Sequence, residues 1–170
     1  SDLSTNTDAE GFLASLDQSA PGWDRRVENV VVIGAGGAAR AAVFGCLERG
    51  AARIHLVNRT LARATAFREL FGPRVLPTRW EDLQRVLKGA DLVANTSSLG
   101  MAGYPELTID LAAVGDNAVV TDAVYVPLET PLLAAAKRRG LRTADGLGML
   151  LHQAGRGFRS EEHTSELQSR

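Results

Sequence analysis

Gly34, Gly36 and Gly37 are the residues of this chain whose types and spacing point most clearly to chemistry. They follow the apolar residues 30–33 and precede a segment in which small and apolar side chains recur at helical spacing. A strand, a tight turn and a helix in this order leave free N–H groups at the start of the helix, where phosphates bind. Gly34 permits the sharp turn, and Gly36 lets a pyrophosphate approach the backbone. The pattern Gly-x-Gly-x-x-Ala in this setting predicts a dinucleotide site formed by Gly34, Ala35, Gly36, Gly37 and Ala38.

The residues after the next apolar segment indicate which dinucleotide binds. In folds of this kind an Asp or Glu about 20 residues beyond the glycines accepts hydrogen bonds from the ribose hydroxyls. Here that place holds Asn58, Arg59 and Thr60, with Arg63 one helical turn later. A carboxylate would repel a 2′-phosphate, whereas two arginines bind one through charge-assisted hydrogen bonds. NADP is therefore favoured over NAD, and the alternative is that both arginines are simply solvated residues at a helix start.

The composition is that of one soluble globular domain. Of 170 residues, 45% are hydrophobic and 23% are charged, which is typical of a globular protein with a hydrophobic core. The net charge of −1 gives no electrostatic attraction to nucleic acid or to an anionic membrane. Cys46 is the only cysteine, which fits a reducing compartment. No apolar run approaches the roughly 20 residues of a membrane span, and the start lacks a signal-peptide pattern. We expect a cytoplasmic protein, and the oligomeric state is not indicated.

Apolar periodicity predicts alternating strands and helices. Strands are expected at 29–33, 53–58, 74–77, 91–95, 118–124 and 141–144, and helices at 8–17, 37–49, 61–71, 80–87, 130–139 and 146–158. Thr7 and Glu10 have the spacing of a capping box, which would begin the first helix, and Asp145 is expected to cap the last one. Strands that alternate with helices over short connections form an α/β fold, a doubly wound parallel sheet (Rossmann-like) with helices on both faces.

Three units are expected along the chain. Residues 1–24 form a helix and a linker to a missing domain, residues 25–158 the dinucleotide-binding domain, and residues 159–170 a tail. The tail contains one apolar residue and cannot contribute to a core. Its string resembles a translated sequencing adapter, so we expect it to carry no function.

Six motifs in order give residues 6–158 a resemblance to the C-terminal, cofactor-binding part of shikimate dehydrogenase. They are Asn6-Thr7-Asp8-Ala9-Glu10-Gly11-Phe12, Gly34-Ala35-Gly36-Gly37-Ala38-Ala39-Arg40, Asn58-Arg59-Thr60 with Arg63, Asn95-Thr96-Ser97-Ser98-Leu99-Gly100-Met101, Asp122-Ala123-Val124-Tyr125-Val126-Pro127 with Thr130-Pro131-Leu132-Leu133, and Asp145-Gly146-Leu147-Gly148-Met149-Leu150-Leu151-His152-Gln153-Ala154. The resemblance implies reduction of 3-dehydroshikimate to shikimate by NADPH, in aromatic amino-acid biosynthesis.

The resemblance also implies roles for single residues. Asp8 would share the proton chemistry of the reaction with a Lys, and Gln153 would donate a hydrogen bond to a substrate hydroxyl. Gly146 and Met149, with Thr96 and Ser97, would lie along the cofactor. Tyr125 follows the carboxyl end of the fifth expected strand, where ligands of open parallel sheets bind, so we expect it at the substrate. The family's Lys belongs to a substrate domain that this chain lacks, and the two lysines present, Lys88 and Lys137, cannot replace it. We therefore expect the fragment alone to be inactive.

Alternatives remain open at this stage. Asp8 beside Thr7 could serve only to cap a helix, and Tyr125 could be a tyrosine at the edge of the core. The whole chain could be a quinate/shikimate dehydrogenase that uses NAD, or a dinucleotide-binding module without chemistry. The three histidines have no metal-ligand spacing, and Ser97 and Ser98 have no His–acid partner for nucleophilic catalysis. Preference for shikimate or quinate is not readable, because most of the pocket lies outside the chain.

Overall fold

A single parallel sheet organises the part of the chain that the computed structural model describes, residues 2–152 and 154–155. Its strands lie in the order β3-β2-β1-β4-β5-β6, and every neighbouring pair is parallel. The strands are β1 (Asn29–Ile33), β2 (Arg53–Asn58), β3 (Val75–Arg79), β4 (Leu92–Asn95), β5 (Val119–Asp122) and β6 (Arg142–Ala144). This is the order of doubly wound dinucleotide-binding folds, so the predicted fold class is confirmed.

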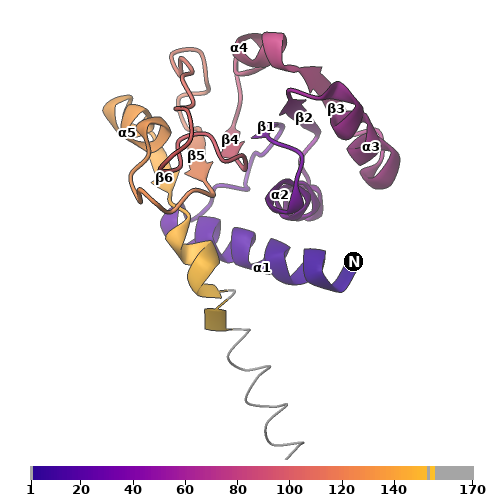
Figure 1. The fold of residues 1–170 in the computed structure, drawn as a ribbon, viewed down its shortest axis with the longest axis horizontal. Coiled ribbons are helices and arrows are strands. Elements are labelled where there is room, and N and C mark those ends of the chain that lie inside the picture. The colour runs from indigo at the N-terminus through magenta and orange to yellow at the C-terminus, as the bar shows by residue number, and fades with distance from the viewer. Residues whose placement is uncertain (1, 153, 156–170) are drawn as a thin grey trace, which may run out of the picture.

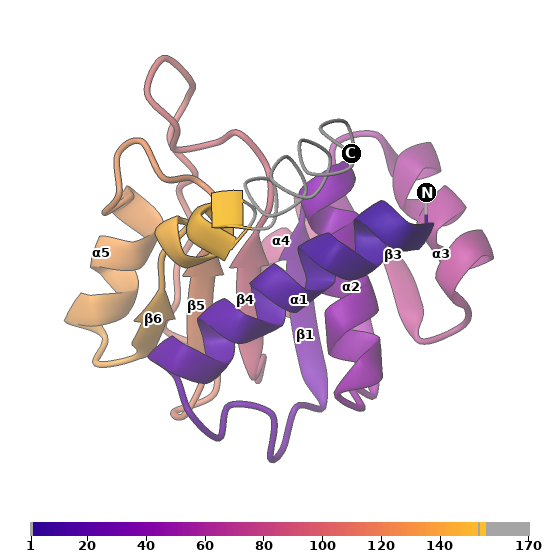
Figure 2. The same ribbon diagram turned by 90° about the horizontal axis from the view of Figure 1, so that it is seen from below.

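Helices cover both faces of the sheet, as Figures 1 and 2 show. They are α1 (Asp2–Ser19), α2 (Gly37–Glu48), α3 (Leu61–Phe71), the 3-10 turn η1 (Trp80–Asp82), α4 (Leu83–Val86) and α5 (Pro131–Arg138). Residues 147–152 are also helical. Helices α1, α2 and α3 share one core cluster, whereas α4 and α5 pack on the other face together with residues 107–114. None of the described helices is long and apolar enough to cross a membrane.

Strand β1 shows why the sheet takes helices on both sides. Val30 and Val32 belong to the core on the α2 face, while Val31 and Ile33 belong to the core on the α4 and α5 face. All four side chains are fully buried. A continuous apolar run is typical of a parallel strand that is covered on both faces.

The first helix begins six residues before its predicted start at 8 and ends two residues after its predicted end at 17. Helix α1 begins at Asp2, so Thr7 lies inside it, and the hydroxyl of Thr7 donates to the Leu3 carbonyl at 3.0 Å. The predicted capping box of Thr7 and Glu10 is therefore wrong, because a helix-interior hydroxyl of this kind bonds back to the preceding turn. The turn before Thr7 is largely polar and offered no apolar stripe to detect. The helix ends at Ser19, and Gly22 in the turn that follows has a φ of +79°.

A charged cluster attaches the end of α1 to the end of α2. The Arg49 guanidinium donates to both Asp17 oxygens at 2.8 Å and to Asp24 at 2.9 Å. It also lies 5.7 Å from the centre of the Trp23 ring, whose Nε1 donates to Asp17. The hydrogen bonds from Arg49 hold the pKa of Asp17 below its usual value. No sequence pattern indicated this cluster, since its members lie up to 32 residues apart.

Candidate functional site

The glycine turn lies where the strand order reverses, between β1 and β4. Gly34 has a φ of +109°, a conformation open to glycine, and its amide donates to the Val57 carbonyl at 2.9 Å. A Cβ at Gly34 would also stand 2.8 Å from the Thr96 hydroxyl oxygen. Gly34 is thus required by the fold, both for the turn and for the close approach of the β4 loop.

Gly36 and Gly37 are different, because the fold does not need them. Both are exposed, both have φ outside the left-handed region, and a Cβ at either would meet no atom within 4 Å. Gly36 is the N-cap of α2, and no side chain caps this helix. The first N–H groups of α2 therefore have no side-chain cap and lie beside two exposed glycines, which is the arrangement that accepts a phosphate at a helix start.

The candidate 2′-phosphate site lies at the carboxyl ends of β2 and β3. Thr60 is the N-cap residue of α3, yet its hydroxyl makes no capping hydrogen bond. Asn58 donates from its side chain to the Thr60 carbonyl at 3.0 Å and shapes the turn that carries Arg59. Arg63 follows in the first turn of α3, so all four predicted residues lie in the short segment between the end of β2 and the first turn of α3. The guanidinium of Arg59 stacks on Trp80, 4.4 Å from the ring centre, and Trp80 was not singled out from the sequence.

The loop after β4 meets the glycine turn from the other side. The hydroxyl of Thr96 donates to the Ile33 carbonyl at 2.6 Å, and that of Ser97 donates to Asn95 Oδ1 at 2.6 Å. Both predicted residues therefore border the glycine turn, and their hydroxyls also hold the loop in place.

A buried carboxylate that sequence reasoning passed over supports this loop. Asp122, 1% exposed, accepts hydrogen bonds from the Asn95 amide at 3.1 Å, the Thr130 hydroxyl at 2.8 Å and the Val124 N–H at 3.0 Å. Burial raises the pKa of its carboxyl, and the three hydrogen bonds oppose that rise. Asp122 joins the loop after β4 to the loop after β5. Its place at the end of a strand, inside a recognised motif, was the available signal.

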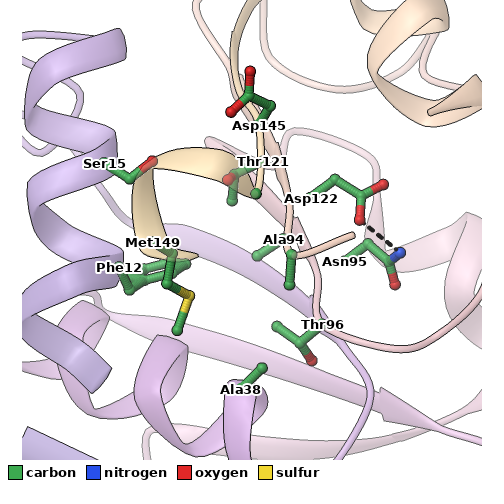
Figure 3. Close-up of a pocket in the computed structure, with 12 residues that line it drawn as sticks. Phe12, Ser15, Ala38, Ala94, Asn95, Thr96, Thr121, Asp122, Asp145 and Met149 are labelled. Atoms are coloured by element: carbon green, nitrogen blue, oxygen red, sulfur yellow. Dashed lines mark hydrogen bonds between the residues drawn. The ribbon is translucent and has the colours of Figure 1, made fainter. Parts of the chain in front are cut away.

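A narrow crevice runs from α1 to the ends of β4 and β5. Figure 3 shows Met149 beside Phe12 of α1, with Ala38 of α2, Thr96 and Asp122 around the same space. Gly146 lines the crevice too, and a Cβ there would stand 2.6 Å from the Ala123 carbonyl oxygen. Gly146 thus lets the returning helical segment approach β5 closely. The first helical hydrogen bond of this segment runs from the Leu150 N–H to the Gly146 carbonyl, so Gly146 is the N-cap residue and the predicted N-cap position of Asp145 is wrong by one residue. Asp145 still accepts a hydrogen bond from the Leu147 N–H at 3.0 Å.

Tyr125 lines a second, wider cleft of about 250 Å³ next to the crevice. Thr96, Ser97 and Met101 form its other wall. The Tyr125 side chain is 48% exposed, so it is not a core residue. Its ring is available to a ligand at the carboxyl edge of the sheet, where ligands of open parallel sheets bind.

Asp8 lies in the interior of α1, and the helix-cap alternative for it is wrong. It precedes Phe12 by one helical turn and Ser15 by two, which puts it on the face of α1 that lines the crevice. Gln153 lies outside the described residues, as does the tail at 159–170. Lys88 and Lys137 are exposed, and Lys137 is paired with Glu129 at 2.7 Å.

Comparison with known proteins decides the family. The family model described as shikimate / quinate 5-dehydrogenase matches residues 17–101, half of the chain. The chain belongs to this family. Relatives include the NADP(+) shikimate dehydrogenase of Rhodopseudomonas palustris strain TIE-1, 66% identical over 155 residues, and that of Azorhizobium caulinodans, 61% identical over 153 residues. These matches cover 91% and 90% of the chain but 55% and 54% of the relatives, so the chain spans about half their length.

Solved members of the family share the fold. The shikimate 5-dehydrogenase of Thermus thermophilus, in complex with NADP(H) and shikimate, is 34% identical with a TM-score of 0.73, covering 91% of this chain and 55% of that one. The quinate dehydrogenase of Corynebacterium glutamicum, in complex with NAD, is 30% identical with a TM-score of 0.81, covering 91% and 56%. The recognition made from six sequence motifs is confirmed.

Proposed function

We propose that this chain is the cofactor-binding part of an NADP-dependent shikimate dehydrogenase, which reduces 3-dehydroshikimate to shikimate. The observation that carries the proposal is the pair Gly36 and Gly37, exposed over open space at an uncapped helix start. Glycine at these positions has no use within the described fold, whereas the close approach of a pyrophosphate to the backbone requires the absence of a Cβ at Gly36. The named activity of the relatives from Rhodopseudomonas palustris and Azorhizobium caulinodans supports the choice of reaction.

The adenosine end supports NADP as the dinucleotide. Arg59, Arg63 and the Thr60 hydroxyl lie at the turn where a ribose 2′-phosphate would be bound, and Asn58 stands where NAD-binding folds place a carboxylate. A guanidinium binds a phosphate through paired, charge-assisted hydrogen bonds. The residues present therefore fit a 2′-phosphorylated dinucleotide, which would supply the hydride for the reduction.

The substrate side is incomplete within this chain. In our proposal Asp8 exchanges the proton that accompanies reduction of the ketone, in concert with a Lys from the absent domain. Tyr125 and Gln153 orient the substrate at the rim, and Met149 with Gly146 forms the surface against which the nicotinamide lies. The crevice and the cleft meet at Thr96 and Ala123, so the two ligands would occupy adjoining spaces. We propose a cytoplasmic location, which fits a chain whose only cysteine is Cys46.

One observation favours a second candidate, a quinate/shikimate dehydrogenase that uses NAD. The quinate dehydrogenase of Corynebacterium glutamicum, in complex with NAD, superposes on this chain with a TM-score of 0.81. Against it stands the segment from Asn58 to Arg63, which has two arginines and no acidic residue. A binding module without chemistry would leave Asp8 without a reason to lie on the crevice face of α1.

Replacement of Arg59 by Ala tests the cofactor assignment. NADPH binding should weaken by ~1.5–3 kcal/mol, the range for a hydrogen bond to a charged group, with NADH binding nearly unchanged. Calorimetric titration of the purified chain with each dinucleotide measures both. Arg138→Ala, at an exposed arginine in the last turn of α5, is the matched control and should change neither affinity. Equal losses for NADPH and NADH in the Arg59 variant would refute the assignment.

A further inference from the structure

Trp80 and Arg59 form a stacked pair at the carboxyl edge of the sheet. Strands β2 and β3 are parallel neighbours, and Asn58 pairs in register with Arg79, so the next residue of each strand end lies side by side. The Arg59 guanidinium carbon stands 4.4 Å from the centre of the Trp80 ring, within the range of a cation–π contact.

The two partners differ in how firmly they are held. Trp80 is partly buried and packs against the core cluster that contains Val31, Ile33 and Val57. It also begins the 3-10 turn η1. A tryptophan has two rotatable side-chain bonds, and packing from below leaves it a rigid platform. Arg59 is exposed, and within residues 2–152 its contact with this ring is the interaction that fixes it.

Stacking on a ring leaves the hydrogen-bonding edge of a guanidinium unused. The indole of a tryptophan is a hydrogen-bond donor only, so a guanidinium that lies over its ring keeps its N–H donors for other acceptors. Within the described part of the chain, the Arg59 side chain has the ring contact and no hydrogen bond or ion pair. The charged edge is thus held in place and kept available to an anion, and the entropy cost of ordering a long side chain has already been met on folding.

We propose that Trp80 is a positioning residue for specificity between dinucleotides, acting through Arg59. It holds the guanidinium where a phosphate on the adenosine ribose can reach it, and it does not touch that phosphate itself. This inference rests on the proposed NADP function. It assigns part of the preference for a 2′-phosphate to a residue on the neighbouring strand end, outside the arginine motif itself.

The test compares Trp80→Met, which keeps apolar bulk but removes the ring, with Trp80→Phe, which keeps an aromatic face. The probes are NADPH, NADH, 2′,5′-ADP and 5′-AMP, titrated calorimetrically into the purified chain. Trp80→Met should weaken NADPH and 2′,5′-ADP by about 3- to 10-fold, the combined worth of the stacking and the ordered rotamer. NADH and 5′-AMP should change less than about 2-fold, and Trp80→Phe should recover most of the loss.

A double-mutant cycle separates this role from a merely structural one. In an Arg59→Ala background, Trp80→Met should cause no further loss of NADPH affinity, because the residue through which it acts is gone. Ile109→Ala removes another partly buried apolar side chain that packs on the same core, and it should leave all four affinities unchanged. Melting temperatures of all variants report whether the fold persists.

Several outcomes would overturn the positioning role. One is that Trp80→Met weakens the binding of all four probes equally. Another is that Trp80→Met causes the same loss of NADPH affinity with and without the Arg59 side chain. A third is that the Trp80→Met protein keeps the full preference for NADPH over NADH. If the unmodified chain itself fails to prefer NADPH and 2′,5′-ADP, the proposed NADP function falls first. If Trp80→Met fails to fold, Trp80→Phe tests the proposal instead. Its ratio of NADPH affinity to NADH affinity must then stay close to that of the unmodified chain, and a lost preference would overturn the positioning role.

Discussion

Alanine at Gly36 should abolish much of the cofactor affinity while leaving the fold intact. Gly36 has open space where an added methyl group would lie and a φ of −109°, which an alanine adopts without strain. Stability should therefore stay within about 0.5 kcal/mol of the unmodified chain, the usual effect of a surface substitution. The same methyl group would stand over the first N–H groups of α2, where we place the pyrophosphate.

The expected loss follows from the hydrogen bonds at stake. A hydrogen bond to a charged group contributes about 1.5–3 kcal/mol, so displacement of the pyrophosphate from one N–H weakens binding by roughly 10- to 150-fold. Gly34→Ala is the contrasting variant. Its φ of +109° and the Thr96 hydroxyl oxygen 2.8 Å from the added carbon predict a strained turn. We expect it to cost about 1–3 kcal/mol of stability, a fall in melting temperature of roughly 2–12 °C for a chain of this size.

Thermal unfolding and NADPH titration on the three proteins provide the assay. Gly36→Ala should melt with the unmodified chain yet bind NADPH weakly, whereas Gly34→Ala should melt early. The reasoning would be refuted by a Gly36→Ala protein that binds NADPH normally. It would also be refuted by one that loses affinity and stability together, since Gly36 would then serve the fold.

Three further results are expected. The chain alone should show no shikimate oxidation with NADP, because the family's Lys and most of the pocket are missing, and measurable turnover by the pure chain would contradict this. Joined to the substrate domain of a relative, Asp8→Asn should lower turnover by about 10²–10⁴-fold with little change in NADPH affinity or melting temperature, and near-normal turnover would remove Asp8 from the proton chemistry. The pKa of Asp122 is raised by burial, so its carboxyl binds a proton more readily in the folded chain than in the unfolded chain. The contribution of Asp122 to the free energy of unfolding therefore falls as the pH rises above about 4, the ordinary pKa of an aspartate. Asp122→Asn should therefore gain melting temperature relative to the unmodified chain as the pH rises above about 4, and a constant difference would contradict the shift.

The fold was largely predictable because its signals are local. The continuous apolar run of β1 and the alternation of strands with helices required a parallel sheet with two covered faces, and the sheet order agrees. The start of α1 was not predictable in this way. Its first turns carry few apolar residues, so their helical state depends on continuation from the buried turns around Phe12 and Leu16.

The candidate site likewise has a part that was predictable from local sequence and a part that was not. The residues of the glycine turn follow one another in the sequence, as do those of the arginine segment, and their types indicate phosphate binding. The contacts of Asp122 with Asn95 and of Trp80 with Arg59 join neighbouring strand ends, and the contact of Asp122 with Thr130 joins a strand end to the start of α5. Such pairs depend on strand order and register, which periodicity alone does not supply. Gly146 was expected beside the cofactor, and only the structure shows its close approach to the Ala123 carbonyl.

The central claim is that this chain binds a 2′-phosphorylated dinucleotide through its own residues. Titration of the unmodified chain with NADPH and with NADH, under identical salt, tests it most directly. The arginine segment should make NADPH bind at least about 10-fold more tightly, the worth of one charge-assisted hydrogen bond. Equal affinity for the two dinucleotides, or no binding of either, would contradict the claim.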